Sequence, residues 1–119
     1  MSITIYGIKT CDTVRKARGW LDAEKVDYRF HDFRVDGLDP KALRRWAKQV
    51  GWEKLLNRGS STFRELPDAD KAGIDEGRAL ALMEANPTVI KRPVLDVDGQ
   101  VTVGFKPDLY QQAVGKRAP

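Results

Sequence analysis

The residue of this chain best suited to chemistry is Cys11, its single cysteine. A cysteine thiolate is a strong nucleophile that attacks disulfides and other oxidised groups. Residues 3–8 have the composition of a short buried strand interrupted by Gly7, and residues 10–13 are of types that cap helices. The pattern therefore predicts that the sulfur lies at the N-terminus of a helix, where unpaired N–H groups and the helix dipole favour an anion.

Three basic residues, Lys9, Arg15 and Lys16, flank Cys11 in the sequence and add positive charge near the sulfur. We expect such a thiol to ionise more easily than a free one. The alternative is that Cys11 is a small buried apolar residue, as a lone cysteine often is. Core cysteines tend to lie within apolar runs, whereas this one lies in a polar turn, so the reactive interpretation is favoured.

Length and composition limit the class of protein. The 119 residues suffice for one domain with a proper core, or for a small domain that carries an insertion. One cysteine excludes an internal disulfide and a Cys-rich metal site, and no apolar run is long enough for a signal peptide or a membrane span. We therefore expect a cytoplasmic protein without a metal. The net charge is +4, but acidic and basic residues are interleaved, which favours small anionic ligands over nucleic acid or membrane.

The elements that would position Cys11 follow from the periodicity on either side. Apolar residues at helical spacing predict a helix from Asp12 to about Lys25. Apolar residues from Val26 to Phe33, with polar residues between most of them, predict a second strand. A strand, a helix and a strand in so few residues imply a right-handed crossover and a parallel pair.

Residues 34–89 are predicted to be mostly helical. Asp39-Pro40 starts a helix with an acidic cap and a proline in the first turn, and Gly51 stops it. One more turn follows at 52–56, residues 57–62 form a polar loop, and another helix runs from about Asp75 to Asn86-Pro87. This segment is too small to form a domain alone, so we expect it to pack beside the sheet.

The last segment returns to strands. Residues 89–97 form an approach loop and a strand, Asp98-Gly99 favours a tight hairpin, residues 101–103 return antiparallel, and Pro107 opens a final helix. The order is β-α-β, a helical insertion, then β-β-α with a mixed sheet, which is a thioredoxin-like α/β fold interrupted between its halves. We predict a single domain, 1–119, with a core of 1–33 and 90–115 and an insertion at 34–89.

In that layout Arg92 and Pro93 lie close to Cys11. A cis proline at Pro93 would leave backbone groups free to pair with an extended thiol substrate such as a peptide. The guanidinium of Arg92 could hold the sulfur as a thiolate and bind an anionic group. The alternative for Arg92 is a solvated arginine before a strand. His31, the single histidine, is expected to have a structural or exposed role.

Four motifs together resemble the arsenate reductase (ArsC) family, and most closely its YffB branch. They are Gly7-Ile8-Lys9-Thr10-Cys11-Asp12-Thr13, Gly51-Trp52-Glu53-Lys54-Leu55-Leu56-Asn57-Arg58, Pro87-Thr88-Val89-Ile90-Lys91-Arg92-Pro93-Val94 and Val103-Gly104-Phe105-Lys106-Pro107. The resemblance covers nearly the whole chain in the same order. It implies a thioredoxin-like fold with a helical insertion, a nucleophilic cysteine at Cys11, and glutathione as co-substrate in place of a tightly bound cofactor. Glutaredoxin or another thiol protein is a further expected partner.

The candidate catalytic residues are therefore Cys11 and Arg92. The candidate residues for binding substrate or glutathione are Lys9, Thr10, Thr13, Arg58, Pro93 and Lys106. Because no resolving cysteine exists in the chain, a thiol from outside must complete any reaction at Cys11. The sequence thus predicts a glutathione-dependent thiol oxidoreductase.

Two alternatives stay open. Arsenate reductases of this family that work with glutaredoxin place three arginines around the cysteine. Here Arg92 matches one, Lys106 stands in place of another, and Arg58 beside Asn57 is the basic residue nearest the third. A lysine cannot replace a bidentate guanidinium without loss, which argues against arsenate as the main substrate. The related Spx regulators bind RNA polymerase and often carry Cys-x-x-Cys, whereas this chain has Val14 at the second position, so a binding module with a vestigial or sensory Cys11 is the other alternative.

Overall fold

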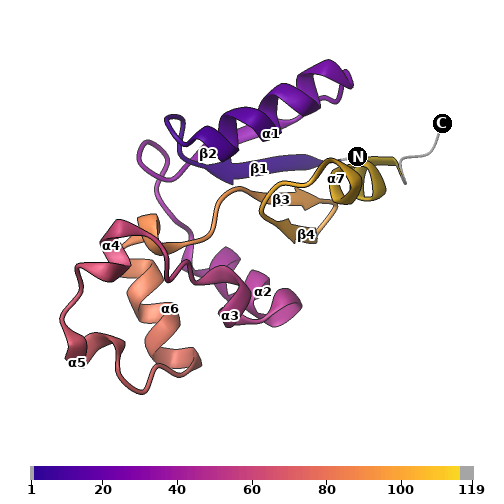
Figure 1. Ribbon diagram of the computed structural model, residues 1–119. Helices are drawn as coiled ribbons and strands as arrows, with labels where there is room; N and C mark the ends of the chain where they lie inside the picture. The colour runs from indigo at the N-terminus through magenta and orange to yellow at the C-terminus, as the bar shows by residue number, and fades with distance from the viewer. Residues whose placement is uncertain (1, 116–119) are drawn as a thin grey trace. The chain divides into compact units, whose positions relative to one another are not determined.

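A computed structural model describes residues 2–115. Met1 and residues 116–119 of the predicted domain lie outside the described residues. The chain divides into two compact units, one of residues 2–37 with 92–115 and the other of residues 38–91. Figure 1 labels the helices and strands of both units. The prediction of a single domain remains a prediction.

The first unit contains a mixed four-stranded sheet in the order β2-β1-β3-β4. The central strand β1 pairs in parallel with β2 and antiparallel with β3, and β3 pairs antiparallel with β4. The strands are β1 (Ile3–Gly7), β2 (Arg29–Asp32), β3 (Val94–Val97) and β4 (Gln100–Val103). This arrangement confirms the predicted α/β fold with its parallel pair and C-terminal hairpin.

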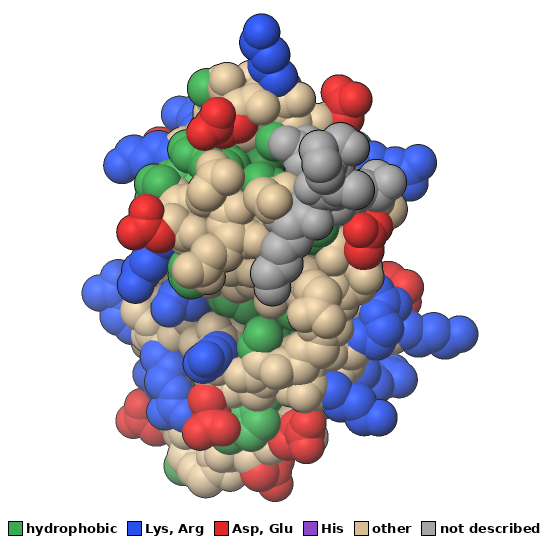
Figure 2. Space-filling model, turned by 90° about the vertical axis from the view of Figure 1, so that its right-hand side faces the viewer, with side chains coloured by type: hydrophobic (Ala, Val, Ile, Leu, Met, Phe, Trp, Pro, Cys, Tyr) green, Lys and Arg blue, Asp and Glu red, His purple; other side chains and the backbone are tan. Residues whose placement is uncertain are grey.

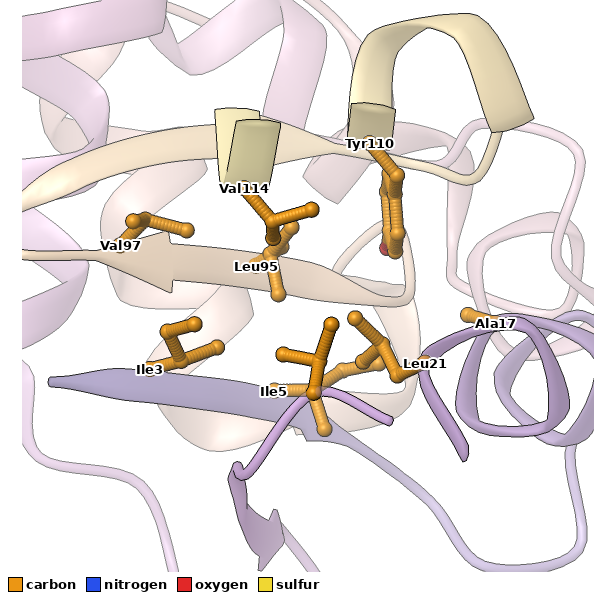
Figure 3. Packing of buried hydrophobic residues seen from close by; sticks show 9 residues of the cluster. Ile3, Ile5, Ala17, Leu21, Leu95, Val97, Tyr110 and Val114 are labelled. Carbon is orange, nitrogen blue, oxygen red and sulfur yellow. The ribbon is translucent and has the colours of Figure 1, made fainter. Parts of the chain in front are cut away.

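Helices α1 (Asp12–Ala23) and α7 (Pro107–Gly115) pack on the same face of the sheet. Figure 3 shows side chains of both helices pointing toward side chains of β1 and β3. The buried cluster consists of Ile3, Ile5, Ala17, Leu21, Val26, Leu95, Val97, Tyr110 and Val114. Alternation along β1 explains this packing, because Ile3, Ile5 and Gly7 share one face of the strand. The core therefore holds β1 and α1 together on either side of the turn that carries Cys11.

The prediction that β2 begins at Val26 is wrong, because Val26 belongs to the hydrogen-bonded C-terminal cap of α1. The N–H of Val26 donates to the carbonyl of Leu21 at 2.9 Å, and the N–H of Lys25 donates to Asp22 at 3.1 Å. Lys25 adopts a φ of 56°, so these two bonds form a Schellman-type helix end. The strand starts only at Arg29, after the chain has left the cap.

The second unit is helical, as predicted for most of its length. Its elements are α2 (Pro40–Val50), α3 (Trp52–Leu55), α4 (Ser61–Arg64), α5 (Asp68–Lys71), α6 (Glu76–Ala85) and the 3-10 helix η1 (Pro87–Val89). The Asp39 carboxylate accepts the N–H of Lys41 at 3.0 Å, and Gly51 ends α2 with a φ of 89°. These confirm the predicted start and stop signals. The short helices α4 and α5 were not predicted, because four residues are too few to show a period.

Basic and acidic side chains are both spread over the face drawn in Figure 2. No helix among residues 2–115 is long and apolar enough to cross a membrane.

Candidate active site

Cys11 is the N-cap residue of α1, at the end of a tight turn that leaves β1. Its N–H donates to the carbonyl of Ile8 at 3.0 Å, which makes Lys9 and Thr10 the central residues of a β-turn. Its own carbonyl accepts the N–H of Arg15 at 3.0 Å, which is the first bond of the helix. Cys11 has extended backbone angles, φ −76° and ψ 127°, as N-cap residues do. The sulfur therefore stands where the free N–H groups of the first turn are exposed.

The environment favours the thiolate of Cys11. Partial burial raises the pKa of the Cys11 thiol, but the N–H of Val14, the hydrogen bond and charge of Arg92, and the N–H of Thr13 outweigh it and lower the pKa below its ordinary value. The sulfur does not close a cap hydrogen bond of the kind that a serine or aspartate oxygen forms. The two amides act instead through their orientation toward a large anion.

Arg92 comes to Cys11 from the segment before β3, at the other end of the sequence. Its guanidinium donates a hydrogen bond to the sulfur of Cys11, and its side chain is half-buried. The peptide bond between Arg92 and Pro93 is cis, and Pro93 is buried where β3 begins. The pairing of β1 with β3 brings these segments together, because Tyr6 lies opposite Val94. Residues 81 positions apart in the sequence thus meet at one sulfur.

Gly7 allows the chain to pass close to α1 before the turn. A Cβ atom at Gly7 would lie 2.6 Å from Cγ2 and 3.2 Å from Cγ1 of Val14, whose side chain is fully buried. Gly7 is not among the glycines with positive φ, so its small size is what the position requires. The turn and the first turn of the helix are packed together through this contact.

Asp32 is a buried carboxylate beside the turn, and the sequence analysis did not single it out. Its side chain accepts the N–H of Lys9 at 3.1 Å and the N–H of Arg34 at 2.8 Å. The residue is only 7% exposed. The available signal was that a charged residue falls at position 32, on the same face of the predicted strand as Val26, Tyr28 and Phe30.

The other candidate residues differ in their placement. Lys9, Thr10 and Lys106 are exposed in the first unit, and the carbonyl of Lys106 accepts the N–H of Tyr110 at 3.0 Å. Thr13 has an exposed side chain, and its amide acts on the sulfur. Arg58 is exposed in the second unit, whereas Cys11 belongs to the first. Their roles in binding remain predictions.

His31 has a structural environment. Its Nε2 donates to the carbonyl of Gly37 at 2.7 Å, and its ring lies 5.0 Å from that of Tyr6 and 6.1 Å from that of Phe33. Residues 2–115 contain no group of three or more His, Cys, Asp or Glu side chains that could hold a metal ion.

Fold and site together define a thioredoxin-like protein with one cysteine at a helix N-terminus. The chain belongs to the ArsC family, whose model matches residues 6–113. This confirms the predicted family.

Three similar proteins place the chain within that family. It is 53% identical to the solved YffB protein, with a TM-score of 0.91, covering 94% of this chain and 98% of that one. It is 51% identical to an arsenate reductase (ArsC) related protein from Brucella melitensis, with a TM-score of 0.76 and coverage of 96% and 95%. An uncharacterized protein from Haemophilus influenzae is 45% identical over 111 residues, 93% of this chain and 97% of that one. The first of these matches confirms the predicted likeness to the YffB branch.

More distant relatives include transcriptional regulators. The global transcriptional regulator Spx of Listeria innocua is 22% identical over 117 residues, which cover 97% of this chain and 88% of the regulator. The chain is therefore similar both to a protein named as arsenate reductase related and to a protein named as a regulator.

Proposed function

We propose that this protein is a glutathione-dependent thiol oxidoreductase in which the Cys11 thiolate is the nucleophile. The observation that carries the proposal is the convergence of the α1 amides and the Arg92 guanidinium on one sulfur. A thiolate held in this way forms at a lower pH than that of an ordinary cysteine. Membership of the ArsC family supports the same class of chemistry.

The proposed reaction has two thiol–disulfide exchange steps. The Cys11 thiolate attacks the glutathione sulfur of a mixed disulfide, so that a bond forms between Cys11 and glutathione while the substrate leaves as a thiolate. A second glutathione thiolate then attacks the glutathione sulfur bound to Cys11. This step releases the Cys11 thiolate and glutathione disulfide. One mixed disulfide is reduced and one free glutathione thiol is oxidised, because the other half of the glutathione disulfide comes from the mixed disulfide itself. No second cysteine is therefore needed in the chain.

The remaining candidate residues have distinct proposed roles. Arg92 stabilises the thiolate before attack and after release, since its charge and hydrogen bond favour the anion. Backbone groups beside Pro93 pair with the peptide part of glutathione. Exposed basic and hydroxyl side chains contact glutathione or the substrate, and these are Lys9, Thr10, Thr13, Arg58 and Lys106. Glutaredoxin or another thiol protein is a candidate partner that regenerates the protein.

The test compares wild type with Cys11→Ser and Arg92→Lys. We expect wild-type Cys11 to form an adduct of one glutathione in intact-mass spectra and to support turnover of a glutathione mixed disulfide. Cys11→Ser should do neither, and Arg92→Lys should be slower in both. Arg29→Lys is the matched control, because Arg29 is an exposed arginine of β2, and it should behave as wild type. Full activity in Cys11→Ser would refute the proposal.

Arsenate reduction is a second candidate, supported by the arsenate reductase (ArsC) related protein that is 51% identical. Lys106 counts against it, because a lysine presents a point charge where a bidentate guanidinium would bind the oxyanion better. Arsenate-dependent oxidation of glutathione, measured beside turnover of a mixed disulfide, separates the two substrates. A rate that is higher with arsenate would favour this candidate.

A regulator without catalysis is a third candidate, supported by the Spx relatives. It predicts a stoichiometric complex with a protein such as RNA polymerase. Capture of that partner by Cys11→Ser as efficiently as by wild type, together with no glutathione adduct on wild type, would favour the regulator.

A further inference from the structure

We infer that Asp32 is a positioning residue for the thiol chemistry, because its carboxylate fastens the turn Ile8–Cys11 to the end of β2 and so fixes the sulfur at the start of α1. The inference rests on the proposed function, in which Cys11 is the nucleophile. Asp32 acts on that sulfur only through the backbone of the turn.

The carboxylate of Asp32 divides its two oxygens between two segments of the chain. Oδ2 accepts the N–H of Lys9, which belongs to the turn, at 3.1 Å. Oδ1 accepts the N–H of Arg34, which follows β2, at 2.8 Å. One side chain thus bridges the segment that delivers Cys11 and the segment that ends the neighbouring strand.

The bond to Lys9 takes the place of a rung of the parallel ladder. The N–H of Phe33 donates to the carbonyl of Gly7 at 2.9 Å, one residue beyond the end of β2. In a continued parallel ladder the N–H of Lys9 would donate next to the carbonyl of Phe33. The chain turns away toward the helix at this point, and the Asp32 side chain accepts that N–H instead. The turn is therefore attached to the sheet where regular pairing stops.

The turn after β2 does not require the bond between Oδ2 of Asp32 and the N–H of Lys9. Its backbone is closed by the N–H groups of Val35 and Asp36, which donate to the Asp32 carbonyl at 3.1 and 2.7 Å. The N–H of Asp32 itself donates to the Asp36 carboxylate at 3.0 Å. These bonds, together with the bond from the N–H of Arg34 to Oδ1 of Asp32, shape the β2 turn. The Oδ2 atom of Asp32 serves the Cys11 turn.

The carboxylate of Asp32 is charged while it accepts the N–H groups of Lys9 and Arg34. Burial raises the pKa of Asp32, but the N–H of Arg34, the N–H groups of Lys9 and Val35, and the charge of Arg34 outweigh it, and the pKa lies below its ordinary value. A buried carboxylate is retained only where such donors compensate for its lost hydration. Both oxygens are committed to backbone donors that hold neighbouring segments in place.

The position of the turn determines what the sulfur meets. Lys9 is the second residue of the β-turn whose fourth residue is Cys11. A shift of the turn moves the sulfur away from the α1 amides and from Arg92, which together lower its pKa. Loss of the Asp32 anchor should therefore make Cys11 less acidic and slower to react at neutral pH.

Asp32→Asn tests the inference, because an amide has one acceptor oxygen and presents its NH₂ group to the other N–H. We expect the thiolate of Cys11 to form at higher pH and alkylation by iodoacetamide at neutral pH to slow by about 3- to 10-fold. A change of charge alone would act in the opposite direction, since removing a nearby negative charge favours the thiolate. The sign of the effect therefore separates positioning from electrostatics.

Asp36→Asn is the matched control. It removes the same charge and one acceptor from the same turn, but Asp36 accepts from Asp32 and not from the Cys11 turn. Alkylation of this variant should stay within about twofold of wild type. Equal or faster alkylation of folded Asp32→Asn, or equal slowing by Asp36→Asn, would overturn the inference.

Hydrogen exchange of the wild-type protein tests the anchor even if Asp32→Asn does not fold. The amide of Lys9 should exchange much more slowly than in an unstructured peptide, because it donates to a buried carboxylate. Exchange at the unstructured rate would overturn the inference. The alkylation assay needs no glutathione, so the two proposals can fail separately. Wild type without a glutathione adduct refutes the function alone, and an unaffected Asp32→Asn refutes the anchor alone.

Discussion

Gly7→Ala tests whether the Cys11 turn and helix α1 are as closely packed as the structure indicates. The new Cβ would lie 2.6 Å from Cγ2 of Val14, a distance that folded proteins do not tolerate. Val14 is fully buried and β-branched in a helix, so its χ1 has little freedom to move the methyl groups away. Overpacking of this kind destabilises by about 1–3 kcal/mol. The reduced entropy of the unfolded chain offsets about 0.4–1 kcal/mol of this, so a net loss is expected.

Urea denaturation of four proteins measures this effect: wild type, Gly7→Ala, Val14→Ala and the double variant. Because Val14→Ala removes both γ-methyl groups, Gly7→Ala should cost little or nothing in that background, and the coupling energy should be about 1 kcal/mol or more. Gly19→Ala is the control, since a Cβ at Gly19 meets nothing within 4 Å. It should stabilise α1 by about 0.5–1 kcal/mol. An equal cost of Gly7→Ala in both backgrounds would refute the steric explanation.

Three further predictions concern stability. Tyr110→Phe removes the O–H that donates to the carbonyl of Gly104 at 2.9 Å, and should lower the free energy of unfolding by about 1 kcal/mol in urea denaturation. Asp39→Ala removes the cap that accepts the N–H of Lys41, and should lower the melting temperature with a loss of about 0.5–2 kcal/mol. Because its folded pKa is lowered, Asp32 stabilises the fold above the unfolded Asp pKa of about 3.9 and loses this effect as pH falls through the lower folded value. Acid unfolding of wild type should therefore steepen below about pH 4, and Asp32→Asn should not show that added steepness; identical acid profiles would contradict this.

Local signals in the sequence were sufficient for most of the fold. Asp39-Pro40 and Gly51 mark the ends of α2, and Asp98-Gly99 marks the hairpin between β3 and β4, because caps and tight turns depend on a few adjacent residues. The late start of β2 was missed. Lys25 has a φ of 56°, a conformation that is unusual for a residue with a side chain and is more often adopted by glycine. Because no glycine stands at this position, the sequence did not indicate the end of the helix.

The candidate site was predictable only in part. The place of Cys11 at a helix N-terminus follows from neighbouring residues, and the place of Arg92 follows from the order of strands once a thioredoxin-like layout is assumed. The role of Asp32 could not be predicted, because its partner Lys9 lies 23 residues away and binds through a backbone N–H. Every residue except proline has a backbone N–H, so neither residue type nor periodicity indicates which of them donates to a side chain.

The most direct test of the central claim is the pKa of Cys11 in the wild-type protein. Because the chain has one cysteine, the ultraviolet absorbance of the thiolate and the rate of alkylation against pH both report this residue alone. The structure predicts that both curves have a midpoint below the value of about 8.5 of an ordinary cysteine, since the α1 amides and Arg92 together outweigh burial. A midpoint at or above that value would show that the sulfur is not held as an anion, and would contradict the account.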